Sequence, residues 1–226
     1  MNFKYSDFDG TLFTPSAPEK IDLLGAFEVM SRLHRYGGRT PGRYSVLNHT
    51  RLCYEIACLL PGGEIMCAAV KVGAILHDVV EGLLGVDIPS PLKRGLVIGG
   101  LSYDVFEASI TRLVRMRLAE TSPNRGLVDL LSMSEVEREV ARIDRHAVYL
   151  EATQLWGAKC GSWVDAYKDD ALPYVQLPSN AMDHWGLLLR ALGGLGIQDD
   201  VGSCKTTKSW HEFLVESCAS PKDDEA

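Results

Sequence analysis

The spacing of apolar residues constrains the fold of this chain most strongly, because it repeats at three- and four-residue intervals in successive segments. One such segment runs from Ile21 to Leu33, and a later one runs from Val136 to Leu150. No series of alternating apolar and polar residues rich in Val, Ile and Thr accompanies them, and the sequence contains no internal repeat. The pattern therefore predicts an all-α fold.

Glycine, proline and capping residues predict where the helices begin and end. The first helix should stop at the glycine-rich stretch RYGGRTPGR, and Ser45 is the expected N-cap of the second. Ser134 and Glu137 have the S-x-x-E spacing of a capping box. The first expected helix begins at Ile21, and the second follows Ser45 and ends at Leu60. Two more span about Glu64–His77 and Tyr103–Ala119, and a further one begins near Ser134. A short helix is expected in DHWGLLLRALGGLG.

The length of 226 residues suits one sizeable domain with an extension. Hydrophobic residues make up 46% and charged residues 23%, which is ordinary for a globular protein. We expect an irregular lead-in at 1–20, a helical core at 21–156, a helical extension packed on the core at 157–216 and a polar tail at 217–226.

Composition also limits the partners and the compartment. A net charge of −7 argues against broad binding to nucleic acid. The amino terminus has no apolar signal-peptide region, and no window reaches the roughly 18 apolar residues of a membrane span. The six cysteines form no C-x-x-C pair, and Cys53 in its helix is expected to behave as a small hydrophobe. These features predict a soluble protein of the reducing cytoplasm, with no membrane and no nucleic acid as partner.

Four chemically distinctive residues interrupt the apolar helices. His49 lies in the first turn of its helix, His77 and Asp78 close another, and Asp144 follows Ile143 on an apolar stripe. An ionised carboxylate there costs several kcal/mol unless it is paired or bound to metal. Two histidines and two carboxylates make a mixed N/O site for Zn²⁺, Mn²⁺, Co²⁺ or Fe²⁺, and a water on such an ion becomes a nucleophile. A lone buried histidine is more often structural, so the prediction depends on the joint pattern.

Charged residues around this pattern are suited to phosphate chemistry. Glu81 lies one helical turn after His77, where a general acid or base for an attacking water would lie. Asp87 follows after a turn. The cations near the two histidine segments form a potential phosphate-binding set: Arg35, Arg39, Arg43, Lys93 and Arg94. Surface arginines are also common without any such role.

The order His49, His77-Asp78, Asp144 resembles the H…HD…D signature of the HD-domain metal phosphohydrolases. The stretches RYGGRTPGRYSVLNHT, LHDVVEGLLGVDIPSPLKR and ARIDRHAVYLEA resemble the 5′-deoxynucleotidase branch and its phage-encoded relatives, which include dATP triphosphohydrolases. This resemblance covers about Ile21 to Glu151. It implies an HD-domain helical bundle.

The resemblance implies a role for each matching residue. His49, His77, Asp78 and Asp144 would bind the metal. Glu81 would act on the attacking water, and Asp87 would assist near the scissile phosphate or the sugar. Arg35 and Lys93 would contact phosphate, Tyr36 would pack on the deoxyribose, and Arg43 joins them as a candidate substrate contact from its place in the cationic set.

Three positions depart from the family pattern. Asn48 replaces the usual acidic residue before the first metal histidine. Asp87 stands one residue further from the His-Asp pair than in the nucleotidases, and Tyr36 replaces their common tryptophan. These differences leave the role of Asp87 and the selectivity for sugar and base open.

The implied function is metal-dependent hydrolysis of deoxynucleotides. We expect a dNTP triphosphohydrolase, with dATP favoured, that releases deoxynucleoside and triphosphate, and Mg²⁺ is a candidate second ion. A 5′-deoxynucleotidase acting on dNMPs is the alternative, and a nucleotide-binding HD module without catalysis is another. Relatives of this kind are often homo-oligomers, so a homo-oligomer is a candidate assembly, and a phage-encoded protein would act in the host cytoplasm.

A second motif and the remaining histidines are expected to carry no chemistry. SDFDGTLF matches the D-x-D-G-T motif of haloacid-dehalogenase-type phosphatases, with Asp7 and Asp9 as its aspartates. That chemistry needs a parallel sheet, for which no alternating β/α pattern follows. His146 is expected to be exposed, and His184 and His211 to pack beside tryptophans. A single-strand nuclease is disfavoured because the chain has no long basic, aromatic stripe.

Overall fold

The computed structural model describes residues 5–6, 12–13, 21–98 and 100–178 of the 226-residue chain. Most of this described part is α-helical, which confirms the all-α prediction. The helices are α1 (Leu23–Arg32), α2 (Val46–Cys58), α3 (Glu64–Leu76), α4 (Val79–Leu84), α5 (Ser90–Lys93), α6 (Tyr103–Thr121), α7 (Arg125–Leu130) and α8 (Ser134–Trp156). Short 3₁₀ segments are η2 (Arg35–Gly38), η3 (Gly157–Lys159) and η4 (Ser162–Tyr167). Two antiparallel hairpins pair β1 (Tyr5–Ser6) with β2 (Leu12–Phe13) and β3 (Val97–Ile98) with β4 (Leu101–Ser102).

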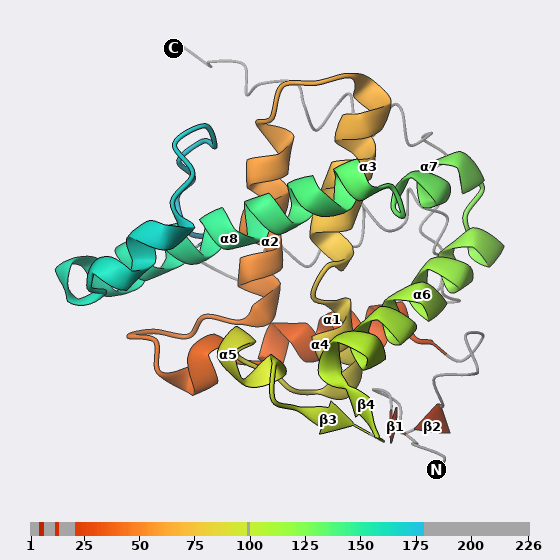
Figure 1. Cartoon of the computed structure of the whole chain (residues 1–226), viewed down its shortest axis with the longest axis horizontal. Coiled ribbons are helices and arrows are strands. Elements are labelled where there is room, and N and C mark those ends of the chain that lie inside the picture. The colour runs from red at the N-terminus through yellow and green to blue at the C-terminus, as the bar shows by residue number, and fades with distance from the viewer. Residues whose placement is uncertain (1–4, 7–11, 14–20, 99, 179–226) are drawn as a thin grey trace, which may run out of the picture.

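The long helix α8 organises the bundle. It crosses α2 and α3, which pack side by side, while α1 packs on α4 at one end (Figure 1). Fully buried side chains from these helices form one core, including Phe27 of α1, Leu52 of α2, Ile75 of α3 and Ile143 of α8. Because α8 touches both α2 and α3, residues on its inner face meet the ends of two other helices.

Capping residues fix the start of α2, immediately before His49. The Ser45 hydroxyl accepts a hydrogen bond from the Asn48 backbone N–H at 3.2 Å, and the Asn48 side chain accepts one from the Ser45 N–H at 3.0 Å. This reciprocal capping box satisfies two backbone donors at the helix end. The N-cap prediction for Ser45 is confirmed, and Asn48 completes the cap of this helix.

Other boundaries differ from the predictions. Met133 is the N-cap of α8 and Ser134 lies within its first turn, so the predicted capping box at Ser134 is wrong. The short helices α4, α5 and α7 and the hairpin β3–β4 were not predicted, because each is too short to show a period. Within the described part of the predicted extension, residues 157–178 form 3₁₀ turns and extended chain rather than α-helix.

Several predictions lie outside the described residues. They concern most of the lead-in at 1–20, including Asp7 and Asp9, the short helix in DHWGLLLRALGGLG, the two histidines His184 and His211, and the polar tail at 217–226.

Gly82 sets how closely α4 approaches α1. A Cβ atom at this position would lie 2.4 Å from the backbone oxygen of Ala26 and 2.8 Å from Cγ of Met30. We expect Gly82→Ala to lower the free energy of unfolding by about 1–3 kcal/mol, because a backbone oxygen cannot move aside cheaply. Urea denaturation measures this change.

Gly126→Ala in α7 is the matched control. The nearest atom to a Cβ there is Oδ1 of Asn124 at 3.9 Å, so the methyl group has room. Alanine should stabilise this helix by about 0.5–1 kcal/mol. If both substitutions lowered the free energy of unfolding by a similar amount, the α1–α4 contact would not be the cause of the destabilisation.

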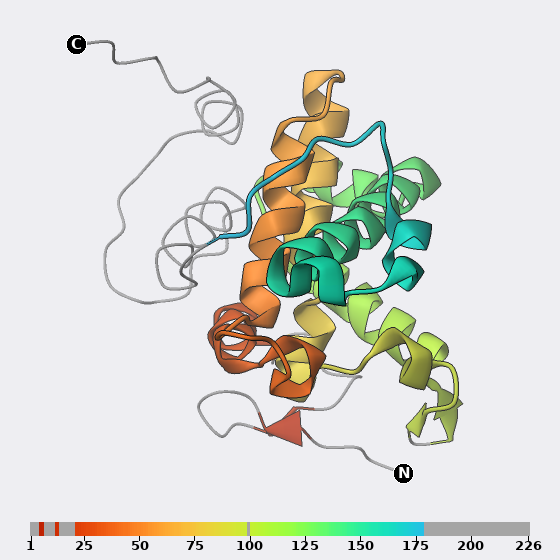
Figure 2. The same ribbon diagram turned by 90° about the vertical axis from the view of Figure 1, so that its left-hand side faces the viewer.

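His146 is buried, at 3% exposure, so the prediction of an exposed side chain is wrong. Its Nδ1 accepts a hydrogen bond from the Asp169 N–H at 3.1 Å, and its Nε2–H donates to the Pro173 carbonyl at 3.3 Å. These contacts require the neutral ring. The segment after η4 is held against α8 by them and continues across α2, as Figure 2 shows.

Burial lowers the pKa of His146 below its ordinary value and Arg142 acts in the same direction, against smaller opposing effects from the Pro173 carbonyl and Asp169. A histidine whose folded pKa is lowered stabilises the fold fully above its unfolded pKa of about 6.5 and loses this contribution as the pH falls below it. We expect the urea midpoint to drop between pH 7.5 and pH 5. His146→Gln, which cannot titrate, should show a smaller drop, and an equal drop would contradict this role.

Candidate metal centre

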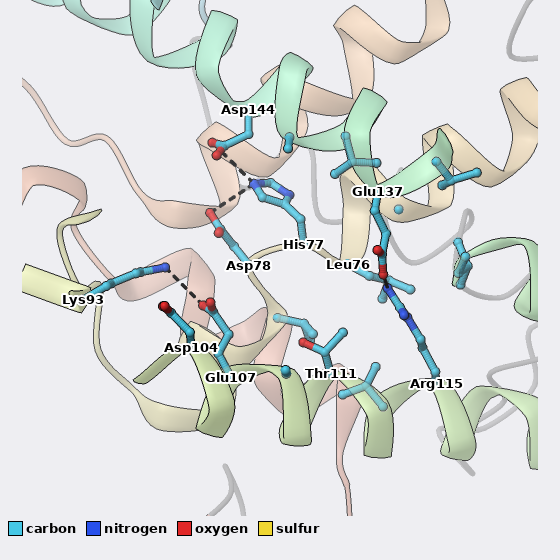
Figure 3. Close-up of a pocket in the computed structure, with 18 residues that line it drawn as sticks. Leu76, His77, Asp78, Lys93, Asp104, Glu107, Thr111, Arg115, Glu137 and Asp144 are labelled. Carbon is cyan, nitrogen blue, oxygen red and sulfur yellow. Dashed lines mark hydrogen bonds and ion pairs between the residues drawn. The ribbon is translucent and has the colours of Figure 1, made fainter. Parts of the chain in front are cut away.

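The four predicted metal ligands lie together in the structure. His49 comes from α2, His77 and Asp78 from the junction of α3 and α4, and Asp144 from α8. Nε2 of His49 is 3.1 Å from Nε2 of His77 and 3.0 Å from Oδ1 of Asp144. The Asp78 Oδ2 lies 3.3 Å from the His77 Nε2 and 3.6 Å from the His49 Nε2. Figure 3 shows His77, Asp78 and Asp144 converging from their separate elements.

Both histidines are held with Nε2 toward the cluster. Nδ1–H of His77 donates to the Ala74 carbonyl at 2.8 Å, and Nδ1–H of His49 donates to Oε1 of Glu151 at 2.6 Å. A neutral ring that donates through Nδ1 carries its lone pair on Nε2. These outer hydrogen bonds therefore fix the tautomer and the orientation that a metal ligand needs.

Asp78 supplies a buried oxygen with no hydrogen bond among the described residues. Its Oδ2 is buried without a hydrogen bond, although it faces two ring nitrogens and lies 3.5 Å from the Arg35 guanidinium. Burial alone would raise the pKa of Asp78, but His77, His49 and Arg35 hold it well below its ordinary value. An ionised, unsatisfied oxygen beside two imidazole nitrogens is a site for a cation.

The spacing of these atoms suits one ion. Ligands at about 2.0–2.2 Å from a metal lie about 3–4 Å from one another, as these donor atoms do. Without a metal, burial and Arg35 act to lower the pKa of His49, but Cys53, Glu151 and Asp144 raise it well above its ordinary value. Protons and a metal ion therefore compete for the same lone pairs, and metal affinity should fall in acid.

Cys53 is a candidate ligand that the sequence analysis missed. It lies one turn after His49 on α2, and its Sγ is 3.5 Å from the His49 Nε2. Ligand atoms of His49, Cys53, His77 and Asp144 all lie within 4.8 Å of one another, so this group can hold a metal ion. A thiolate favours Zn²⁺, Co²⁺ or Fe²⁺ over Mg²⁺. The H-x-x-x-C spacing, which places both side chains on one helix face, was the available signal.

Glu151 is the second missed residue. It is fully buried on α8, two turns after Asp144, and it binds three partners of the site. In addition to its bond with His49, the Glu151 carboxylate accepts a hydrogen bond from the Tyr36 hydroxyl at 2.5 Å and forms an ion pair with Arg35 at 3.4 Å. Burial raises the pKa of Glu151, but Arg35 and His49 lower it below its ordinary value. An ionised Glu151 thus orients His49 and anchors η2.

The two predicted substrate-binding side chains of η2, Arg35 and Tyr36, contact other residues of the protein. Arg35 pairs with Asp78 and Glu151, and the Tyr36 ring packs edge-on against Trp156 at 5.0 Å between centroids. The Tyr36 backbone has a positive φ of 57°, and its N–H donates to Oδ2 of Asp87 at 3.0 Å. The structure thus places Asp87 against the η2 backbone, where it supports this strained turn.

Arg43 and Arg39 are exposed, so the structure does not gather the predicted cationic cluster at the metal centre. Lys93 does lie beside the metal centre. Its Nζ is 3.2 Å from Glu81 and 3.2 Å from Glu107. The sequence did not indicate a role for Glu107. Glu107 lies one turn after Tyr103 on α6, where nothing in the apolar pattern distinguishes it from a surface residue.

Glu81 has the surroundings of an acid–base group. It is 2% exposed, its Oε1 contacts Lys93, and its Oε2 is buried without a hydrogen bond among the described residues. Burial and then repulsion by Asp78 raise the pKa of Glu81 to about 8, against the opposing charge of Lys93. A carboxyl group with a pKa near neutrality can both accept and return a proton.

A cavity of about 520 Å³ opens beside the metal centre, between α3, α6 and α8 (Figure 3). His77, Asp78, Asp144 and Lys93 lie at one end of it. The other lining residues are Gly73, Leu76, Val79, Asp104, Glu107, Ala108, Thr111, Val114, Arg115, Leu131, Val136, Glu137, Val140 and Ala141. Neither Arg35, Tyr36 nor Arg43 lines this space.

Comparison with known protein families and curated proteins does not assign this chain to a family. The sequence matches no protein-family model, and no curated protein is significantly similar to it. In the described part of the chain, no helix combines the length and the apolar character needed to cross a membrane.

Proposed function

We propose that this protein is an HD-domain, metal-dependent phosphohydrolase that acts on deoxynucleotides. The observation that carries the proposal is the convergence of two correctly oriented histidine Nε2 atoms with the Asp78 and Asp144 carboxylates. The order of these residues in the chain is that of the H…HD…D signature, and Glu81 lies buried nearby. The mostly helical fold agrees with an HD bundle.

The protein's own groups divide the work of hydrolysis. His49, His77, Asp78 and Asp144 would hold a divalent ion, which would supply positive charge to the phosphate and acidify a nearby water. Glu81 accepts the proton of the attacking water through its free Oε2 and returns it to the leaving group. Lys93 holds Glu81 in place and adds positive charge at the cavity. Asp144, at 41% side-chain exposure, lies on the open side from which substrate enters.

The number of phosphates on the substrate separates two candidate functions. The resemblance to phage relatives favours a triphosphohydrolase acting on dATP. The cations that line the cavity are Lys93 and Arg115, and each is already paired with a glutamate. This shortage of free positive charge favours the second candidate, a 5′-deoxynucleotidase acting on monophosphates, unless Mg²⁺ accompanies a triphosphate.

An end-product assay tests the proposal. Protein loaded with Mn²⁺, Co²⁺ or Zn²⁺ is incubated with each dNMP and dNTP, with NTPs as controls, and chromatography separates nucleoside, phosphate and triphosphate. Deoxynucleoside with triphosphate indicates a triphosphohydrolase, and deoxynucleoside with phosphate from dNMPs alone indicates a nucleotidase. Unchanged substrates throughout would contradict the proposal and favour a non-catalytic nucleotide-binding module.

A further inference from the structure

We infer that the space between α6 and α8 is a binding slot for a planar heteroaromatic base, on the side of the metal centre away from η2. The inference rests on the proposed function, since it places the base of the same nucleotide whose phosphate meets the metal. It goes beyond the sequence-based expectation, which placed the deoxyribose at Tyr36 and assigned no site to the base.

The size and the lining of the slot suit a small, largely apolar group. Gly73 and Leu76 of α3 form its floor, Thr111 and Val114 line it from α6, and Val140 lines it from α8. In Figure 3 these walls extend from His77 and Asp78 toward Arg115 and Glu137. A volume of about 520 Å³ lies within the range of about 300–1,000 Å³ typical of small-ligand sites.

Gly73 lets α3 pack closely against α8 at the edge of the slot. A Cβ atom at residue 73 would lie 2.8 Å from Cγ2 of Val140, so any larger residue would push against α8. Ala108 of α6 and Ala141 of α8 present only methyl groups to the space. Small side chains on these two helices leave room beside the metal centre that longer apolar residues would fill.

The far end of the slot offers hydrogen-bonding groups. Arg115 and Glu137 face each other across it at 2.9 Å, with side chains 29% and 53% exposed. A guanidinium beside a carboxylate presents donors and acceptors together, as the edge of an amino-substituted base requires. The Thr111 hydroxyl adds a group that can donate or accept from the α6 wall.

The charges that line the cavity indicate where the phosphate and the base of the nucleotide would lie. Glu137 lies at the end of the cavity away from the metal ligands and would repel phosphate there, whereas Asp104 and Glu107 lie beside Lys93. Positive charge near phosphate is available from Lys93 and from an ion on His77, Asp78 and Asp144. The phosphate therefore belongs at the metal end and the uncharged base in the slot.

Photo-cross-linking with 8-azido-dATP and 8-azido-dAMP tests the location directly. After irradiation with Mn²⁺ present, peptide mapping should find the adduct in residues 103–121 or 134–156. An adduct confined to residues 35–43 would overturn the inference, and so would the absence of any adduct that unlabelled nucleotide can displace.

Ala108→Leu fills the slot from the exposed side of α6, and Ser109→Leu is the matched control, because Ser109 does not line the cavity. Equilibrium dialysis with radiolabelled dATP and dAMP should show binding at least tenfold weaker for Ala108→Leu, with Ser109→Leu unchanged. Ser109→Leu should also hydrolyse p-nitrophenyl phosphate, which has no base, at the wild-type rate. Equal binding by the two variants would overturn the inference.

These outcomes separate the inference from the proposed function. Turnover of a deoxynucleotide with an adduct outside the slot keeps the function and rejects the slot. An adduct in the slot without turnover keeps the slot and rejects catalysis.

Discussion

Replacing Glu151 by alanine should lower the free energy of unfolding of the metal-free protein by about 3–5 kcal/mol. Glu151 is fully buried and joins the His49 ring, the Arg35 guanidinium and the Tyr36 hydroxyl. Removing it leaves a buried guanidinium and a buried imidazole without their shared acceptor. Urea denaturation in the presence of a chelator measures the loss.

Two further variants show whether the loss comes from the buried charge. Glu151→Gln retains an acceptor oxygen but loses the charge, so its destabilisation should be smaller than that of alanine. Glu137→Ala removes an ion pair on the same helix whose carboxylate is 53% exposed, and it should cost only about 0–1 kcal/mol. If Glu151→Ala cost no more than Glu137→Ala, the proposed anchoring of His49 and η2 would be wrong.

Replacing Glu81 by glutamine should reduce the turnover of deoxynucleotides by about 10²–10⁴-fold, the usual contribution of a general acid or base. Glutamine preserves the shape of the side chain but cannot accept the proton of the attacking water. Metal content should stay the same, because Glu81 contacts Lys93 rather than a metal ligand. Steady-state kinetics together with metal analysis provide both readouts.

Glu107→Gln separates this role from the support of Lys93. Glu107 also lies 3.2 Å from the Lys93 Nζ, so its substitution removes an ion pair from the same lysine without removing the proposed base. Its turnover should fall less than tenfold. Equal losses in the two variants would indicate that both glutamates act only by positioning Lys93.

The sequence predicted the helices that carry the metal centre because their apolar faces are long enough to show a period. Each chemically distinctive residue could then be placed on a helix end or on a stripe, as His49, His77 and Asp144 were. The short elements α4, α5 and α7 escaped prediction because fewer than two helical turns show no period. The N-cap of α8 was missed because a capping-box spacing at Ser134 is only a local signal.

The residues missed at the site share a physical reason. Glu151 lies two turns after Asp144, and its importance depends on Arg35, Tyr36 and His49, which arrive from distant segments. Cys53 looked like a core residue because it is one, at 1% exposure, and only the position of the His49 Nε2 makes it a possible ligand. Local patterns identify which side chains are unusual, whereas tertiary contacts decide their partners.

The metal content of the purified protein tests the central claim most directly. Wild-type protein and the Asp144→Asn variant are incubated with Zn²⁺, Mn²⁺, Co²⁺ or Fe²⁺, dialysed, and analysed by inductively coupled plasma mass spectrometry. We expect the wild type to retain a stoichiometric divalent metal ion and the variant to retain far less under the same conditions. A folded wild-type protein that retains none of these ions would contradict the assignment of His49, His77, Asp78 and Asp144 as a metal centre.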